Sequence, residues 1–245
     1  MKLISLNVWC GVKYEELKRF LKYQSRDTDI FCFQEVRNGK YLNQDEKINE
    51  KDELFQEIKI LLPDFTGYFV EMVPGVGIAT FIRNGVELVQ VKSAQILTAK
   101  DLEHLPEING VKFYPRMLQS LYLKDKNLII HNFHGIPKGN KKDTPERDLQ
   151  TQRLLEIIDS NDAPQILVGD FNLSIDTEAI TRLESRMQNL IKRSEFKTTR
   201  NSNYKYFRIT PFADYIFVSR DIKVNKFIVL PDEVSDHLAL LLNFT

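Results

Sequence analysis

Short apolar runs recur along this chain, and polar or turn-forming residues separate them. Runs of this length and composition are typical of strands that are buried on both faces of a sheet. The pattern therefore predicts strands at Leu3 to Leu6, Ile30 to Phe33, Ile78 to Ile82, Leu121 to Leu123, Leu128 to Phe133, Ile166 to Val168, Tyr215 to Val218 and Leu238 to Leu242.

Four segments between these runs show the periodicity of amphipathic helices. The third begins most clearly, because Thr144 is a capping residue and Pro145 suits the first helical position. The fourth is predicted to run from Thr177 to Ile191. The apolar faces are formed by Leu17, Phe20 and Leu21, by Leu54, Phe55, Ile58, Leu61 and Leu62, by Leu149, Leu154, Leu155 and Ile158, and by Ile180, Leu183, Met187, Leu190 and Ile191.

Predicted strands and helices alternate from one end of the chain to the other, without a repeat or a break in composition. This order indicates a single layered α/β domain over residues 1–245. Only a short polar turn, Lys124 to Asn127, separates two of the strands, which is typical of an antiparallel hairpin. At least part of the sheet is therefore expected to be antiparallel.

Composition is that of an ordinary globular protein, with 42% hydrophobic and 28% charged residues. Lys plus Arg and Asp plus Glu both number 34, so an anionic substrate would have to be bound locally rather than by overall charge. No membrane span is expected, and Met1 to Val8 lacks the features of a signal peptide. Cys10 and Cys32 lie in or beside apolar strands, which predicts reduced thiols and a cytoplasmic location.

Polar side chains that can bind metal or phosphate stand where the predicted strands end. Because strand ends converge in layered α/β proteins, these side chains are expected to meet despite their distance along the chain. The candidates are Asn7, Glu35, His134, Asp170, Asn172, Asp236 and His237.

Each candidate also has an ordinary structural explanation. Asn7 could form a turn, and Glu35 could pair with Arg37 at the surface. His131 is predicted to be a hydrogen-bonded core residue, because its side chain should point away from that of His134. The functional interpretation therefore depends on the joint occurrence of the candidates in this order.

Together the candidates resemble the endonuclease/exonuclease/phosphatase superfamily, which has the DNase I fold. By this resemblance the fold is expected to be an α/β four-layer sandwich, with two mostly antiparallel β-sheets packed face to face and flanked by helices. The matching segments are Leu6-Asn7-Val8-Trp9, Phe33-Gln34-Glu35-Val36, Asn132-Phe133-His134-Gly135, Gly169-Asp170-Phe171-Asn172, Ala213-Asp214-Tyr215-Ile216 and Ser235-Asp236-His237.

The resemblance implies a role for each matching residue. Glu35 would be the main metal ligand, with Asn7 and Asp236 beside it, and this oxygen-rich set suits Mg²⁺ or Mn²⁺. His237 would pair with Asp214, which would fix its tautomer and favour its charged form.

The implied reaction is in-line attack of water on phosphorus without a covalent intermediate. Asp170 would orient or deprotonate the water, while Asn172 and His134 would donate hydrogen bonds to the phosphoryl oxygens. Either Asp170 or His237 would take the proton. The family commonly has a leucine after the histidine, whereas Gly135 follows His134 here, so the resemblance is weakest at this position.

A basic and aromatic segment over residues 186–208 contains Glu195 as its only acid. Cations interleaved with aromatic rings suit a phosphate backbone and unstacked bases, although a solvated helix end and loop would have the same composition. Lys197, Arg200 and Lys205 are therefore predicted to bind substrate.

A second basic cluster directly follows the candidate histidine His134. It contains Lys138, Lys141 and Lys142, and it is expected to form the rim of the site, although charged loops are common.

Three functions are compatible with these features. The first is a nuclease or nucleic-acid phosphodiesterase, the second a hydrolase of a small phosphorylated metabolite or lipid headgroup, and the third a catalytically silent nucleic-acid binder. We rank them in that order, because a silent protein has no need for the full set of candidate groups. The formal net charge of +0 keeps the first two close, and no obligate protein partner is predicted.

Overall fold

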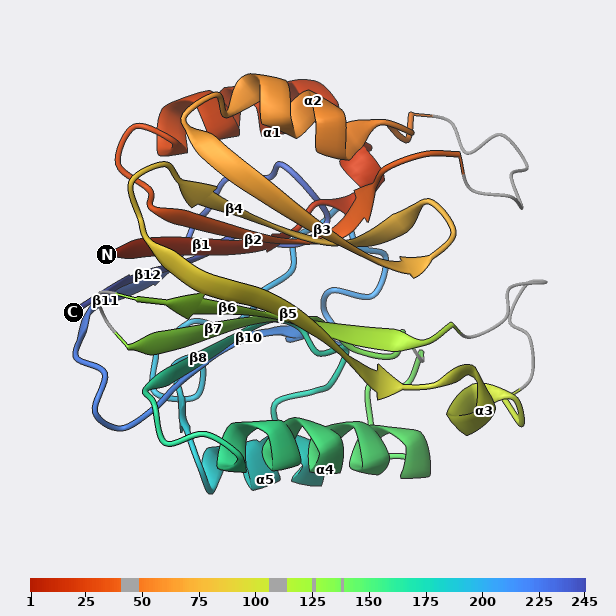
Figure 1. The fold of residues 1–245 in the computed structure, drawn as a ribbon. Coiled ribbons are helices and arrows are strands. Elements are labelled where there is room, and N and C mark those ends of the chain that lie inside the picture. The colour runs from red at the N-terminus through yellow and green to blue at the C-terminus, as the bar shows by residue number, and fades with distance from the viewer. Residues whose placement is uncertain (41–48, 106–113, 125–126, 138) are drawn as a thin grey trace.

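Two six-stranded sheets pack face to face, and helices cover their outer faces (Figure 1). This arrangement is seen in a computed structural model that describes residues 1–40, 49–105, 114–124, 127–137 and 139–245. The four-layer sandwich expected from the resemblance is therefore confirmed. Among the described residues, no helix combines the length and apolarity needed to cross a membrane.

Each sheet has one parallel pair of strands at its centre and antiparallel pairs on either side. The first sheet has the order β11 (Val224–Val229), β12 (Leu240–Phe244), β1 (Lys2–Asn7), β2 (Ile30–Arg37), β4 (Val76–Arg83) and β3 (Phe65–Val73). The second has the order β5 (Leu88–Leu97), β6 (Arg116–Leu123), β7 (Leu128–His134), β8 (Gln165–Asp170), β10 (Asp214–Val218) and β9 (Gln188–Asn189). The parallel pairs are β1 with β2 and β7 with β8, and the predicted hairpin is the antiparallel pair of β6 and β7.

Helices α1 (Tyr14–Gln24) and α2 (Leu54–Leu61) cover the first sheet, and α4 (Pro145–Asp159) and α5 (Glu178–Glu184) cover the second (Figure 1). Two shorter elements are η1 (Trp9–Gly11) and α3 (Ala99–Leu102). The predicted start of α4 is confirmed, because the Thr144 side chain accepts a hydrogen bond from the Arg147 N–H.

The fourth predicted helix, over residues 177–191, is too long. Helix α5 ends at Glu184, and the chain then turns into the short strand β9. The Asn189 side-chain oxygen accepts hydrogen bonds from the backbone N–H groups of Ile191 and Lys192, at 3.1 Å and 3.3 Å, which stabilises the turn instead of a helix. Met187 and Ile191 are nevertheless buried, so the apolar pattern correctly predicted burial in this segment but wrongly predicted a helix.

The C-terminal ends of the strands in the two parallel pairs meet at one end of the sandwich. Asn7 lies beside Gln34 in the first sheet, and His134 lies beside Asp170 in the second. Because the inner faces of the two sheets pack together, largely through apolar residues, these polar strand ends are brought into contact at the rim of the core. The topology therefore positions the candidate residues of both sheets together.

Candidate active site

Asn7 connects the candidate residues of the two sheets. Its side-chain amide donates to Glu35 Oε1 at 3.0 Å and to Asp170 Oδ2 at 3.2 Å. The Asn7 oxygen accepts the backbone N–H of Trp9 at 3.0 Å. A carbonyl oxygen has two lone pairs, so this oxygen keeps one for a further partner.

Two glycines allow the ends of β7 and β8 to come close together. At Gly169, which has φ +142°, an added Cβ would lie 1.8 Å from the Phe133 carbonyl oxygen. At Gly135 an added Cβ would lie 2.3 Å from the Phe171 carbonyl oxygen. A leucine at position 135 would clash with this backbone, which explains the departure from the family pattern and keeps His134 beside Asp170.

Three side chains of this region start from left-handed backbone, which residues other than glycine rarely adopt. The φ angles are +54° at Glu35, +54° at Asn172 and +50° at Lys141. Such conformations persist only where the surrounding structure enforces them, and they concentrate at functional sites. The backbone is thus arranged to direct these side chains inward.

His237 forms the predicted pair with Asp214. Its Nδ1 lies 2.8 Å from Asp214 Oδ2, and Thr199 Oγ1 donates to the same oxygen at 2.9 Å. Burial opposes a charge on His237, but Asp214 and Asp170 together raise its pKa to about 9. His237 is therefore an imidazolium at neutral pH, and its Nε2 faces Asp170 Oδ2 at 3.7 Å.

Asp170 is a buried carboxylate surrounded by cationic groups. Burial raises its pKa, but His237 and the other cations around it outweigh this effect, so the pKa lies below its usual range. The backbone N–H of Asn172 donates to Asp170 Oδ1 at 2.8 Å and holds the carboxylate in place. Asp170 is therefore ionised and oriented at neutral pH.

His134 is buried and lies between the two carboxylates. Its Nε2 lies 3.8 Å from Glu35 Oε1 and 3.7 Å from Asp170 Oδ2, and the Asn172 amide approaches it at 3.2 Å. Burial lowers the pKa of His134 to about 3, so this ring is neutral. In this geometry His134 Nε2 accepts from the Asn172 amide. The donation to phosphate that the resemblance implied for His134 stays a prediction.

The oxygen donors around Glu35 suit a hard divalent cation. Burial and the neighbouring charge of Asp236 raise the pKa of Glu35, so a bound cation would stabilise its charged form. Ligand atoms of Glu35, His134 and Asp170 all lie within 4.8 Å of one another. This cluster contains Asp170 and His134 in place of the predicted ligand Asp236, and its carboxylate oxygens suit a hard divalent cation such as Mg²⁺ or Mn²⁺.

Two buried cations belong to the site; Arg116 was not recognised in the sequence, and Lys141 was expected only at the rim. Arg116, at the start of β6, is buried, and burial lowers its pKa to about 10 although Glu35 and Asp170 act in the opposite direction. Lys141 is also buried, and its Nζ donates to Asn172 Oδ1. The predicted basic rim is thus partly inside the site, and Lys142 is at the surface. Lys138 lies outside the described residues.

The three residues predicted to bind substrate separate into two groups. Lys197 and Lys205 are exposed, and no hydrogen bond or ion pair joins them to the site within the described residues. Arg200 is only 2% exposed, and its backbone pairs with that of His237. Only Arg200 therefore lies in the site.

Ordinary structural roles explain two further polar residues. Arg37 pairs with Glu50 and Asp52, so it is not the partner of Glu35. His131 is hydrogen-bonded through both ring nitrogens, to Ser120 Oγ at 2.8 Å and Gln165 Oε1 at 2.9 Å. The prediction that His131 is a core histidine is confirmed.

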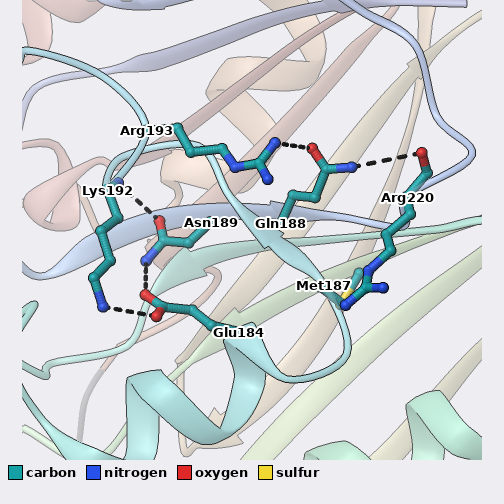
Figure 2. Close-up of a pocket in the computed structure, with 7 residues that line it drawn as sticks. All are labelled: Glu184, Met187, Gln188, Asn189, Lys192, Arg193 and Arg220. Atoms are coloured by element: carbon teal, nitrogen blue, oxygen red, sulfur yellow. Dashed lines mark hydrogen bonds and ion pairs between the residues drawn. The ribbon is translucent and has the colours of Figure 1, made fainter.

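A separate hollow lies at the opposite end of β10 from Asp214, beside the edge strand β9. Figure 2 shows its polar side chains bonded to one another, including Lys192 to Glu184 and Arg193 to Gln188. The residues that line it are Glu184, Met187, Gln188, Asn189, Lys192, Arg193 and Arg220. None of the predicted site residues is among them.

A model of the Endonuclease/Exonuclease/phosphatase family matches residues 4–237. No curated protein matches the sequence. Among solved structures, a mannosyl-6-phosphatase of Bacteroides thetaiotaomicron is 17% identical with a TM-score of 0.75, and 100% of this chain and 99% of that chain are covered. The human Nocturnin catalytic domain with bound sulfate anion is 21% identical with a TM-score of 0.68, covering 100% and 93%. TDP2 from C. elegans is 19% identical with a TM-score of 0.69, covering 99% and 74%.

Proposed function

Because the chain belongs to the endonuclease/exonuclease/phosphatase family, we propose that it hydrolyses a phosphoric ester with the help of bound Mg²⁺ or Mn²⁺. The observation that carries this proposal is the contact between the two sheets. Asn7 holds Glu35 and Asp170 together, and the Asp214–His237 pair stands beside them. Apolar side chains at this rim would stabilise the fold at least as well as these charged groups, so stability alone does not explain them.

The metal would be held by Glu35, Asp236 and the Asn7 oxygen. When bound there, it would neutralise charge on the phosphoryl and leaving oxygens. These ligands come from three separate strand ends and loops, and the Asn7 hydrogen bond to Glu35 orients the main ligand. Hydrogen bonds that position a metal ligand commonly tune metal affinity.

The remaining residues act on water and on the phosphoryl group. Asp170 is ionised, so it orients the attacking water toward phosphorus and takes its proton as the new P–O bond forms and the bond to the leaving oxygen breaks. Asp214 and Asp170 raise the pKa of His237, which suits it to donate from Nε2 to a phosphoryl oxygen. Asp214 and Thr199 keep the ring in this orientation.

Developing negative charge would be stabilised by the buried cations Arg116 and Lys141. Lys141 reaches the site through its contact with Asn172, and both side chains are withdrawn from bulk water. Electrostatic stabilisation is strongest where charges are fixed before the reaction and water is excluded. Asn172 then serves to orient Lys141 and His134 as well as the carboxylate of Asp170.

Two of the substrate classes predicted from the sequence have support in the structure. A nuclease or phosphodiesterase is supported by the exposed Lys197 and Lys205, which accompany the aromatic side chains Tyr204 and Tyr206. A hydrolase of a small phosphorylated metabolite or lipid headgroup is supported by the buried cations, which suit a compact anion. The mannosyl-6-phosphatase and the sulfate-bound Nocturnin domain are consistent with phosphate-like anions in this fold.

A panel of phosphoric esters tests the proposal. It should contain an oligonucleotide, nucleotides, sugar phosphates, inositol phosphates and choline phospholipids, each assayed with Mg²⁺ and with excess chelator. We expect at least one ester to be hydrolysed only when Mg²⁺ is present. Absence of hydrolysis across the panel in Mg²⁺ and Mn²⁺ would reject the enzymatic function and favour a silent binding protein.

We also propose a cytoplasmic location, supported by the chemistry of the cysteines. Cys32 is a buried thiol whose pKa is raised to about 12 by burial, and no disulfide joins the two cysteines of the chain. An intact-mass measurement on protein purified without reductant would check this, because a native disulfide would lower the mass by two hydrogens.

A further inference from the structure

Arg200 carries a buried positive charge whose guanidinium is incompletely hydrogen-bonded. Among the described residues, its Nε and Nη1 atoms have no hydrogen-bond partner. Its guanidinium lies 3.8 Å from the centre of the Tyr204 ring, and its backbone pairs with that of His237. Unpaired buried donors are costly, so proteins retain them mainly where a ligand completes the bonding.

Lys141 is a second buried cation, held by contacts from outside its own loop. Arg147 of α4 donates to Asn140 Oδ1 and to the Asn172 carbonyl oxygen, both at 2.9 Å, and thereby ties the loop to the end of β8. Lys141 has φ +50°, and its Nζ bonds Asn172. The lysine is therefore fixed before any substrate binds.

Arg116, Lys141 and Arg200 together form what we call the cation pocket. All three are at most 5% exposed, and the charge of each acts on Asp170. These three cations match the three carboxylates of Glu35, Asp170 and Asp236. The Asp214–His237 pair is set aside, as is the buried Arg147, whose charge acts on Asp143 and Glu146 as well as on Asp170. A divalent metal ion would then leave two positive charges for the substrate to neutralise.

We propose that the cation pocket makes the enzyme a phosphomonoesterase, with Lys141 and Arg200 selecting a terminal phosphate dianion over a phosphodiester. A terminal phosphate carries a charge of about −1.5 to −2 at neutral pH and three strong acceptor oxygens. A phosphodiester carries one charge and two such oxygens. In a buried site this difference in charge should change the binding energy strongly, because charges interact more strongly there than in water.

This inference rests on the proposed function and narrows its substrate class. The terminal phosphate could belong to a phosphorylated sugar or to the end of an oligonucleotide, since both present the same dianion. Exposed Lys197 and Lys205 would then contact the remainder of the substrate rather than the reacting phosphate.

The test compares 4-nitrophenyl phosphate with bis(4-nitrophenyl) phosphate, which share a leaving group and differ in charge. Lys141→Met and Arg200→Met should each lower kcat/KM for the monoester by roughly 10–100-fold, the range expected for a charge-assisted hydrogen bond. The diester should lose clearly less than the monoester, because it carries one negative charge fewer for these cations to neutralise. Inorganic phosphate should be a weaker competitive inhibitor of both variants than of the wild type, in parallel with the loss of kcat/KM for the monoester.

Matched controls remove a similar charge far from the site. Lys124→Met removes an exposed lysine that pairs with Glu87, and Arg19→Met removes an exposed arginine on α1 that pairs with Glu16. Both should leave the two rates unchanged. Arg200→Lys keeps the charge and should retain most of the monoester preference, and circular dichroism should show that every variant is folded.

Equal losses on both esters, or a wild type that cleaves the diester and ignores the monoester, would overturn this inference while leaving the proposed function intact. A wild type that cleaves neither ester nor any member of the panel would reject both. Phosphate release from a sugar phosphate and from a terminally phosphorylated oligonucleotide separates the two sources. Internal cleavage of that oligonucleotide without release of its terminal phosphate would also overturn the inference.

Discussion

Two polar clusters are buried between the same two sheets, and they differ in how completely their groups are paired. In the middle of the sandwich, Asn132 bonds Gln34 at 2.7 Å and the carbonyl oxygens of Phe33 and Ala79 at 3.2 Å and 3.1 Å. Thr80 donates to Gln119 at 2.6 Å in the same layer. We call this the inter-sheet network.

The site at the strand ends has the opposite character. Its groups are charged, and several of them lack protein partners, including Nδ1 of His134, Nε of Arg116 and two donors of Arg200 within the described part of the chain. In the inter-sheet network only Gln34 Oε1 lacks a partner among the described residues, against the four atoms of the site. The inter-sheet network holds the sheets in register, whereas the charged site keeps bonding capacity for something that the chain does not supply. Buried polarity alone therefore does not identify function, but incomplete pairing together with charge does.

The largest effect should follow from removing the groups that act on water and phosphate. Asp170→Asn and His237→Ala should each slow hydrolysis by roughly 10²–10⁴-fold, the usual range for positioned proton-transfer groups. Steady-state kinetics on the best ester of the panel would measure this, and circular dichroism should show an intact fold. Asp159→Asn, which changes an exposed carboxylate paired with Arg186, is the matched control. Near-normal rates in both site variants would mean that the site is misplaced.

Breaking the inter-sheet network should instead reduce stability. Asn132→Ala would leave Gln34 and two backbone carbonyl groups without their partner, at a cost of about 3 kcal/mol in the free energy of unfolding. Urea unfolding would measure the loss, and kcat should stay within about threefold of the wild type. A large fall in kcat with unchanged stability would erase the distinction between the two clusters.

His131 has a structural role like that of the inter-sheet network. Its contribution should appear as a loss of folding stability at acidic pH. Burial lowers its pKa to about 4, against 6.5 for an unperturbed histidine, so the unfolded chain takes up the proton first as the pH falls. The stabilising effect of a neutral His131 is present above pH 6.5 and is lost as the pH falls toward 4.

Between pH 7 and 4.5 this loss should be about 2 kcal/mol in the free energy of unfolding. Urea unfolding of the wild type and of His131→Gln at both pH values isolates the contribution, since all other titrating groups are shared. If the variant lost stability with the same pH slope as the wild type, His131 would not be a buried neutral histidine.

The smallest effect is expected from the exposed lysines near the site. The double variant Lys197→Ala, Lys205→Ala should change the turnover of a small chromogenic phosphate ester by less than about twofold, because exposed charges are screened by water and salt. Initial rates at low and moderate ionic strength would measure this. A tenfold loss at both salt concentrations would place these lysines in the site.

The sequence predicted eight inner strands and missed the four edge strands β3, β5, β9 and β11. Inner strands are apolar on both faces, so they appear as continuous apolar runs. The edge strand β5 instead exposes Lys92 and Gln95 between partly buried residues, and β11 exposes Lys226, which interrupts the pattern. Tertiary packing, not local composition, makes these segments strands.

The same contrast applies to the site. Asn7, Glu35 and Asp170 were found because they end apolar strands, whereas Arg116 was missed because its strand was predicted to begin five residues later, at Leu121. Lys141 was predicted only at the rim, because its burial depends on Arg147, which ties its loop to the end of β8. Arg200 and Lys197 stand in one basic segment, and only the backbone pairing with His237 separates them.

The central claim is that the strand ends of the two sheets form one metal-dependent hydrolytic site. Its most direct test is the rate of ester hydrolysis as Mg²⁺ is returned to chelator-treated protein, for the wild type and for Glu35→Gln. The wild type should be inactive in excess chelator and recover along a saturable Mg²⁺ curve, while Glu35→Gln should need at least about tenfold more metal, since it loses the charged ligand. Undiminished turnover of the wild type in excess chelator would contradict the claim.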